Sequence, residues 1–397
     1  MKISYGKNVY SNEEIRAVVN QLKKTTQMSK SVKLFEKKIS KIFNKKYSLM
    51  VNSGTSAITL ALEILNIKKN SEVIVPVLNF GTAISCILRA NLKPIFVDID
   101  PSTLQIDCSL IEKNISKKTK AMMIPNLIGN LPQLDKLREI CNKHKLFLIE
   151  DSADTLSSNY NNKSSGYYSD VSICSFYGSH VISCAGNGGI LCFNKKSYFD
   201  KASVLRSWGR SSSILKESEN INDRLNIKLK GFEFDRKFVF QELGYNFEPS
   251  EIGAAFGLVQ LKKLKKFISI RRRNFDLHQD FFYKHKEYFN PIKVDKKIHT
   301  NFLAYPILIK PNKKFSRKNM QQYLEKKGIQ TRPIFSGNIL RHPAFNHLKS
   351  KINKVERYKN ADYVMKYGLL VGMHQGLTVK NIDYIHKNIK NFLLDAK

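Results

Sequence analysis

Short apolar runs alternate with helical patterns between about residues 48 and 195, and this alternation limits the possible folds more than any other feature. The runs are nearly continuous in apolar residues, as expected for strands buried on both faces. Helical patterns, such as those over 58–65, 83–90 and 133–144, separate them. The sequence therefore predicts an α/β fold with a mixed, mostly parallel sheet covered by helices. The predicted strands are 47–53, 72–77, 93–100, 121–127, 146–151, 171–177 and 189–194.

The alternation of short strands and helices gives way to a long helical pattern near residue 250. A helical pattern over 251–282 leads into an apolar run at 300–309, and a helix-strand-helix tail follows. A length of 397 residues suits one large domain and a smaller one. We expect a large domain over 1–250, and a long helix with a smaller α/β domain over 251–397.

Composition excludes several classes of protein. With 42% hydrophobic and 25% charged residues the chain is typical of a globular protein, and no run approaches the roughly 20 apolar residues of a membrane span. The first residues lack the pattern of a secretory signal. The six cysteines fall mostly in apolar runs without a CxxC pair, which favours a reducing cytoplasm and excludes a disulfide framework.

The formal net charge of +34 raises the alternative of a nucleic acid or an anionic membrane as partner. The lysines are spread along the whole chain and do not gather on one arm with interleaved aromatic residues. We therefore expect a solvated surface, with neither a nucleic acid nor a membrane as partner. A positive field would also suit a substrate that carries phosphates.

Four segments carry residues suited to chemistry. The first is the turn of small residues over 52–57, between a predicted strand and a predicted helix. Free backbone N–H groups at such a helix start can bind a phosphate, although Ser53 or Thr55 could equally serve as an ordinary helix cap.

The second segment places Asp151 at the end of a predicted strand, with Asp154 three residues later. A carboxylate there can reach a ligand and keep a ring nitrogen protonated, or it can cap the next helix. The third segment runs from Ser175 to His180 and into a glycine-rich loop. His180 is either a proton-transfer group or a structural histidine.

The fourth segment combines Asn246, before the long helix, with a Pro- and Gly-containing loop over 331–341. Arg332 and Arg341, together with the amide of Asn338, could bind an anion. The alternative is ordinary surface charge. No group of residues in the sequence predicts a metal site.

Together these segments resemble the sugar aminotransferase family of vitamin-B6 enzymes, the DegT/DnrJ/EryC1/StrS family. The resemblance covers nearly the whole chain and rests on ordered blocks. These are NSGTSAITLAL, VPVLNFGTAISCILRANLKPIFVDID, IEDSADTL, SFYGSH and GYNFEPSEIGAAFGLVQL. It implies the type I aminotransferase fold, and a homodimer whose two active sites are built from both subunits.

The resemblance also assigns roles to individual residues. It implies that Gly54, Thr55 and Ser175 hold the phosphate of pyridoxal or pyridoxamine phosphate. It implies that Phe80 stacks on the pyridine ring, and that Asp151 pairs with the ring nitrogen. Asp154 would lie near the ring hydroxyl, and Asn246 would reach the cofactor phosphate of the partner subunit.

One position departs from the transaminases of this family. They carry a lysine that holds the cofactor covalently, and this chain has His180 at that place, with no lysine between Lys163 and Lys195. The departure resembles the 3-dehydratase subset, as do the blocks GNLPQLDKL and TRPIFSGNILRHPAF. Asn187 stands where the family often has an acid.

This subset has two branches. The branch with an iron–sulfur centre carries cysteines after a WGR segment, whereas here Trp208-Gly209-Arg210 is followed by three serines and no cysteine occurs after Cys192. The resemblance is to the iron-free branch, which removes the C3 hydroxyl of GDP-4-keto-6-deoxymannose. It implies His180 as the acid and base, glutamate as the amino donor, and Arg332, Asn338 and Arg341 as substrate contacts. The alternatives are a 4-amino-sugar aminotransferase and a catalytically inactive ligand-binding relative.

Overall fold

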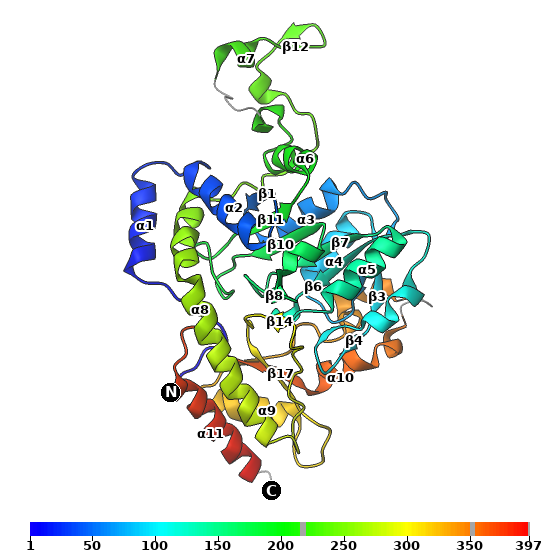
Figure 1. The fold of residues 1–397 in the computed structure, drawn as a ribbon, viewed down its shortest axis with the longest axis vertical. Helices are drawn as coiled ribbons and strands as arrows, with labels where there is room; N and C mark the ends of the chain where they lie inside the picture. The colour runs from blue at the N-terminus through cyan, green and yellow to red at the C-terminus, as the bar shows by residue number, and fades with distance from the viewer. Residues whose placement is uncertain (215–219, 350–353, 396–397) are drawn as a thin grey trace.

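A seven-stranded sheet forms the centre of the computed structural model, which describes residues 1–214, 220–349 and 354–395 (Figure 1). The strand order is β1-β11-β10-β7-β6-β2-β3. β11 runs antiparallel to both of its neighbours, and the other pairs are parallel. The prediction of seven strands in a mixed, mostly parallel sheet is confirmed. Their bounds are β1 Tyr47–Val51, β2 Glu72–Pro76, β3 Lys93–Val97, β6 Thr119–Pro125, β7 Phe147–Asp151, β10 Val171–Ser175 and β11 Gly189–Phe193.

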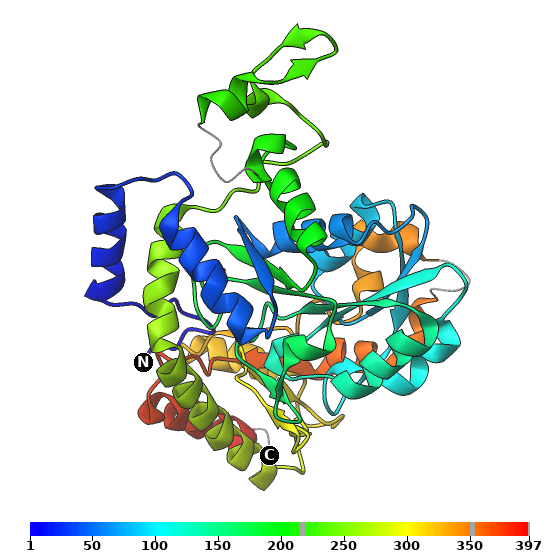
Figure 2. The same cartoon turned by 45° about the horizontal axis from the view of Figure 1, so that its top comes forward.

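Helices cover both faces of this sheet (Figure 2). The side chains of β1 show why: Leu49 and Val51 pack in one apolar cluster with α3, whereas Met50 packs in another with Phe35 of α2. Successive strand residues point to opposite faces, so a strand covered on both sides must be apolar throughout. The helices of this part are α1 Asn12–Leu22, α2 Lys30–Ile42, α3 Gly54–Ile64, α4 Gly81–Arg89, α5 Leu134–His144 and α6 Lys196–Arg206.

The long helix α8 (Glu251–Lys284) leads to a three-stranded antiparallel sheet, as the pattern after residue 250 predicted. Ile3 forms a β-bridge with Ile329, so the first residues of the chain lie against this second region. The division into two domains near residue 250 remains a prediction. The elements of this region are β15 Tyr305–Leu308, β16 Thr331–Arg332, β17 Gly368–Val371, α9 Arg317–Lys326, α10 Lys359–Tyr367 and α11 Val379–Asp395.

Three small sheets complete the described strands. β8 pairs with β9 and with β14, β4 pairs with β5, and β12 pairs with β13. Their bounds are β4 Ile99–Asp100, β5 Gln105–Ile106, β8 Asn159–Tyr160, β9 Lys163–Ser164, β12 Lys228–Leu229, β13 Phe232–Glu233 and β14 Ile298–His299.

A segment between α6 and α8, called the arm below, extends away from the body of the molecule (Figure 1). It carries α7 (Ile221–Leu225), β12 and β13. Several of its large apolar side chains are exposed. Phe232 is 76% exposed, Phe240 63% and Leu243 96%. A globular chain rarely presents so many large apolar groups on one extension unless another surface covers them.

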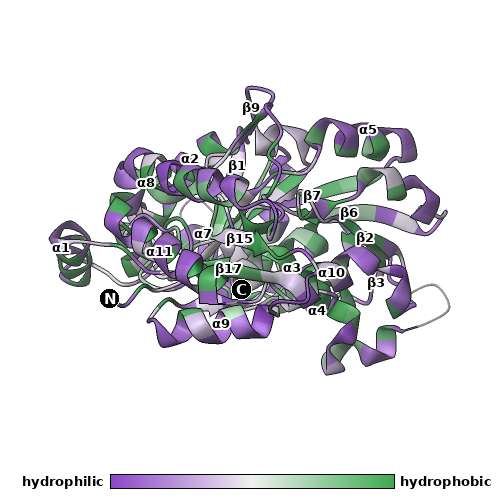
Figure 3. Cartoon of the chain, turned by 90° about the horizontal axis from the view of Figure 1, so that it is seen from below, coloured by the Kyte–Doolittle hydropathy of each residue, from purple (hydrophilic) through white to green (hydrophobic). Residues whose placement is uncertain are grey.

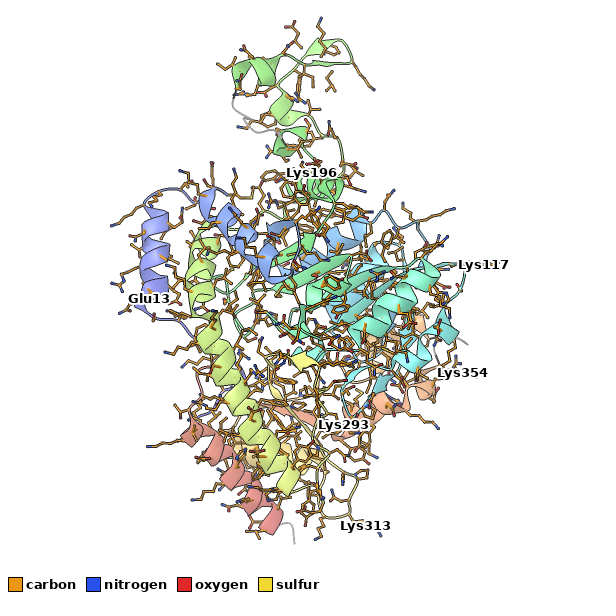
Figure 4. The ribbon with its side chains drawn as sticks, viewed as in Figure 1. Glu13, Lys117, Lys196, Lys293, Lys313 and Lys354 are labelled. Atoms are coloured by element: carbon orange, nitrogen blue, oxygen red, sulfur yellow. The ribbon has the colours of Figure 1, made fainter. Side chains whose placement is uncertain are left out.

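The outer surface is polar and basic, and the centre is apolar. Figure 3 shows hydrophobic residues on the central strands and many hydrophilic residues on the peripheral helices. In Figure 4, Lys117 and Lys354 lie on the right, Lys196 near the base of the arm, and Lys293 and Lys313 in the lower part of the molecule, in keeping with a scattered charge. All six cysteines are buried and unpaired. Within the described ranges, no helix has the length and apolar character needed to span a bilayer.

Candidate functional site

A cavity of about 430 Å³ opens beyond the carboxyl ends of β7 and β10, next to the N-termini of α3 and α4. This is the edge at which a parallel sheet is expected to bind ligands. Seven of the residues singled out from the sequence line this one cavity: Gly54, Thr55, Phe80, Asp151, Asp154, Ser175 and His180.

The start of α3 forms one wall of the cavity. The side chain of Ser53 caps the helix by accepting from the N–H of Ser56, at 3.1 Å. Close packing requires glycine on both sides of this turn. A Cβ atom on Gly54 would lie 2.8 Å from the Cβ of Ser175, and one on Gly189 would lie 2.1 Å from the carbonyl oxygen of Ser53. The first N–H groups of α3 have no partner within the helix, so they can receive an anion in the cavity.

Two buried carboxyl groups lie at the floor. Among the described residues, Asp151 accepts only from the N–H of Ala153 (3.0 Å), and Asp154 accepts from the N–H of Ile128 (2.8 Å). Burial raises the pKa of Asp151 to about 6; burial and the neighbouring Asp151 raise that of Asp154 to about 7. No cation among the described residues pairs with Asp151. A buried carboxylate without a counter-ion fits a ligand that brings a protonated ring nitrogen.

His180 lies in the loop between β10 and β11. Its Nδ1 is 3.1 Å from the carbonyl oxygen of Ser175, and its ring lies edge-on to Tyr177. A carbonyl oxygen only accepts, so Nδ1 carries the proton and Nε2 keeps the lone pair of a base. Burial, and after it the charge of Arg271, lower the pKa of His180 to about 4. This value is lower than the near-neutral one expected from the sequence, because the imidazole is removed from water.

Phe80 stands at the mouth of the cavity, 60% exposed, at the N-cap of α4. Its ring meets Phe335 edge-on, with centroids 6.1 Å apart. Beside it, the Nδ2 atom of the buried Asn79 has no hydrogen-bond partner among the described residues. An open aromatic face next to an unused donor fits a planar ring with polar substituents.

A second cavity, of about 480 Å³, adjoins the first and shares Tyr5, Phe80 and Phe335 with it. Of the three residues predicted to bind substrate, only Arg332 lines it. Its guanidinium carbon lies 5.9 Å from the centroid of the Tyr5 ring, and its Nη1 donates to the carbonyl oxygen of Thr331. The mixed aromatic and cationic lining is suited to an extended, anionic ligand.

Asn338 and Arg341 lie outside both cavities. The buried Asn338 donates to Asp362 (2.9 Å) and accepts from the N–H of Leu340. Arg341 makes a bidentate ion pair with the same Asp362, with two N···O distances of 2.6 Å. The structure therefore engages these two residues in the fold of the 338–341 loop.

Asn246 is also not among the residues that line the cavity. It pairs with Ser207 at the base of the arm, and its carbonyl oxygen accepts from Asn52. The predicted contact of Asn246 with the cofactor phosphate of a partner subunit remains a prediction.

The structure adds cavity residues that the sequence did not single out. Tyr5, Leu303 and Phe335 come from segments that are far in sequence from β7 and β10, and Asn79, Tyr177 and Ser179 lie in or beside segments that were named. Asn187, noted only as a departure in the glycine-rich loop, also lines the cavity. The neighbouring motifs could have indicated Asn79, Tyr177 and Ser179. No local pattern pointed to Tyr5 or Leu303.

The sheet order and the cavity define the fold of the vitamin-B6-dependent aminotransferases. A family profile described as the DegT/DnrJ/EryC1/StrS aminotransferase family matches residues 9–390. The chain belongs to this family, and the predicted fold class is confirmed.

Two curated relatives and one solved structure are similar to this chain over most of its length. The chain is 30% identical over 394 residues to the GDP-4-keto-6-deoxy-D-mannose 3-dehydratase of Escherichia coli O55:H7, covering 96% of this chain and 98% of that protein. It is 29% identical over 365 residues to the GDP-perosamine synthase of Escherichia coli O157:H7, covering 92% and 90%. A solved structure of the Escherichia coli 3-dehydratase with bound hydrated pyridoxal phosphate has a TM-score of 0.87 at 30% identity, covering 98% and 100%.

Proposed function

We propose that the protein is a pyridoxamine-phosphate-dependent 3-dehydratase of a nucleotide-linked 4-keto-6-deoxy sugar, with GDP-4-keto-6-deoxymannose as the favoured substrate. It would act in the cytoplasm in the synthesis of a 3,6-dideoxy sugar. The observation that carries the proposal is His180, at the wall of a cavity that no lysine among the described residues lines. A 4-amino-sugar aminotransferase needs such a lysine to hold and release the cofactor covalently.

The wall around α3 would hold the cofactor phosphate with the N–H groups of Gly54 and Thr55 and the hydroxyl of Ser175. Phe80 would cover one face of the ring. Asp151 would keep the ring nitrogen protonated, since a cation there relieves the cost of burying the carboxylate. Asp154, whose pKa is raised to about 7, can donate to or accept from the ring hydroxyl at neutral pH.

When bound, pyridoxamine phosphate supplies an amine for the C4 ketone and an electron-accepting ring. His180 is neutral at pH 7, so its Nε2 can take the proton released from the cofactor carbon that carries the amine. The protonated imidazole can then give this proton to the C3 hydroxyl, which departs as water. Anionic ligands in the cavity would raise the low pKa of His180 and make this second step easier. Hydrolysis would then release ammonia and the 3,6-dideoxy-4-keto sugar and leave the cofactor in its aldehyde form, and glutamate would restore the amine form.

Arg332 is the best-placed of the predicted substrate contacts, because it lines the cavity that adjoins the proposed cofactor site. A guanidinium is well suited to a diphosphate. The matches to both a 3-dehydratase and a perosamine synthase, each named for a GDP-linked sugar, support GDP as the nucleotide.

A homodimer is part of the proposal. The exposed apolar side chains of the arm, such as Phe232 and Leu243, are suited to burial against a second copy. Asn246, at the base of the arm, would then reach the cofactor phosphate in the partner subunit.

The test incubates the purified protein with pyridoxamine phosphate, glutamate and one of three substrates, the GDP-, CDP- or dTDP-linked 4-keto-6-deoxy sugar. Mass spectrometry should show loss of the C3 oxygen, with the fastest turnover for the GDP sugar. Net gain of an amino group with the C3 hydroxyl retained would refute the dehydratase and favour the aminotransferase. Absence of any reaction, with the ligands bound, would favour an inactive ligand-binding relative.

A further inference from the structure

Arg271, near the middle of α8, is a fully buried cation without an acidic partner. Its side chain is 0% exposed, and in the described part of the chain no carboxylate forms an ion pair with it. Its Nη1 donates to the carbonyl oxygens of Phe302 (2.8 Å) and Leu303 (3.0 Å), and its Nε donates to the Oε1 of Gln375 (2.7 Å). A buried charge that only neutral dipoles solvate is costly, so this position calls for an explanation.

The second hydrogen bond of the Gln375 side chain offers an explanation. Its Nε2 donates to the carbonyl oxygen of Val181, at 3.2 Å, and both residues are buried. Val181 directly follows His180. Two consecutive hydrogen bonds therefore join the guanidinium of Arg271 to the backbone that carries the imidazole.

Arg271 is connected to another part of the cavity lining as well. Leu303 lines the cavity, and its N–H donates to the carbonyl oxygen of Ile128 at 2.8 Å. The N–H of Ile128 in turn donates to the carboxylate of Asp154, at 2.8 Å. A single buried side chain is thus linked to the loop of the proposed acid and base on one side, and to an acidic residue of the proposed ring site on the other.

We propose that Arg271 is a positioning residue for His180: through Gln375 it fixes the backbone of the His180 loop relative to the wall that carries Leu303 and Asp154. The same charge disfavours the imidazolium form, and it acts with burial to lower the pKa of His180. Among the described residues, the other titratable groups that line this cavity with the imidazole are Tyr177, in edge contact, Tyr5, and the carboxyls of Asp151 and Asp154. Arg271 therefore keeps His180 in place and in its base form.

Gln375→Glu separates this role from general stability. The new carboxylate still accepts from Arg271 and compensates its charge, so the protein should fold. It can no longer donate to Val181, and it repels that carbonyl oxygen. Arg271→Met removes the charge itself. Arg272→Met is the matched control, because Arg272 is the next residue of the same helix and is exposed.

Two readouts use the full-length protein without cofactor. Hydrogen exchange followed by mass spectrometry should show faster exchange over residues 177–184 in Gln375→Glu. In Arg272→Met the same residues should exchange at the wild-type rate. NMR of histidine-labelled protein, assigned with a His180→Asn sample, should show His180 titrating at higher pH in both Arg271→Met and Gln375→Glu. A purely structural clamp would lower the unfolding midpoint without moving this titration.

The inference rests on the proposed function only where His180 is taken as the base. With cofactor and sugar, Gln375→Glu should lower kcat by about 100-fold and leave KM nearly unchanged, as expected for a misplaced base. A folded Gln375→Glu protein with wild-type exchange and wild-type His180 titration would overturn the positioning role, even if Arg271→Met fails to fold. If both readouts move but no sugar is dehydrated, the positioning role stands and the proposed function fails.

Discussion

The Nδ1 atom of His180 lies 3.1 Å from the carbonyl oxygen of Ser175, five residues earlier and at the end of β10. Ser175 thereby connects two parts of the cavity, because its side chain also packs against the turn at Gly54. The strand that presents a hydroxyl to the proposed phosphate site also sets the tautomer of the imidazole. The geometry leaves Nε2 as the basic nitrogen.

His180→Asn should retain cofactor binding and lower kcat for dehydration by about 10²–10⁴-fold, the usual contribution of a general base. His180→Lys should also abolish dehydration and should produce the absorbance of a Schiff base with pyridoxal phosphate. His299→Asn, at an exposed histidine, serves as control. A His180→Asn enzyme with wild-type turnover would show that another group moves the proton.

Asp151→Asn should stabilise the cofactor-free protein at pH 8 and inactivate the enzyme. Burial raises the pKa of Asp151 from 3.8 to about 6, so ionising it in the folded state costs up to roughly 3 kcal/mol, and the isosteric amide avoids this cost. The penalty is absent below the unfolded-state pKa, grows as the pH rises from that value to the folded-state pKa, and is constant above it. Urea unfolding at pH 4 and pH 8 measures it. An equal effect of the substitution at both pH values would contradict the assignment.

The buried His278 and the half-buried His386 form a neutral pair, with a 3.0 Å distance between Nδ1 and Nε2. Burial lowers the pKa of His278 to about 4 and that of His386 to about 3, below the value near 6.5 of an unfolded chain. The unfolded state therefore binds more protons, and the pair's contribution to stability falls as the pH drops from about 7 towards 4.

His386→Gln can still donate to His278 but cannot take up a proton. We expect the loss of unfolding free energy between pH 7 and pH 5 to shrink by roughly 1–2 kcal/mol in this variant. Urea titrations at the two pH values measure the difference, with the exposed His299→Gln as control. An unchanged loss would show that the pair does not contribute to acid sensitivity.

Arg332→Ala and Arg341→Ala should behave differently, although both side chains come from one loop. Arg332 lines the outer cavity, so its removal should raise KM for the nucleotide sugar by about 10-fold or more, the range of a charge-assisted hydrogen bond. Arg341 is paired with Asp362 and partly exposed, so its removal should cost about 1 kcal/mol of stability or less. Steady-state kinetics and thermal unfolding separate the two outcomes, and a larger KM effect at Arg341 would refute this assignment.

Phe232→Asp combined with Phe240→Asp should shift the protein from dimer to monomer, because both apolar side chains are exposed on the arm. Light scattering after size exclusion measures the mass. Leu394→Asp, at an apolar residue that is 61% exposed near the end of α11, should leave the mass unchanged. A monomeric wild-type protein would refute the proposed homodimer directly.

Local sequence patterns were sufficient to predict the strands and to single out the segments that contain Gly54, Asp151, Ser175 and His180, whereas Phe80 came from the family resemblance alone. Each of the seven strands of the main sheet was predicted within a few residues, because burial on both faces demands continuous apolar runs. Gly54, Asp151, Ser175 and His180 share one cavity because each follows or ends a strand at the same edge of the sheet. Asn338 and Arg341 show the limit, since charge and an amide group alone do not reveal an internal partner such as Asp362.

The sequence by itself determined the class of fold, the edge of the sheet at which the cavity lies, and the presence of a histidine instead of a lysine there. Tertiary structure alone decided the antiparallel insertion of β11, the arrival of Tyr5 and Leu303 at the cavity, and the link from Arg271 through Gln375 to the His180 loop. The reason is physical: strand and helix patterns arise from neighbours a few residues apart. The partners of Arg271 are 31 to 104 residues away, and only chain packing brings them together.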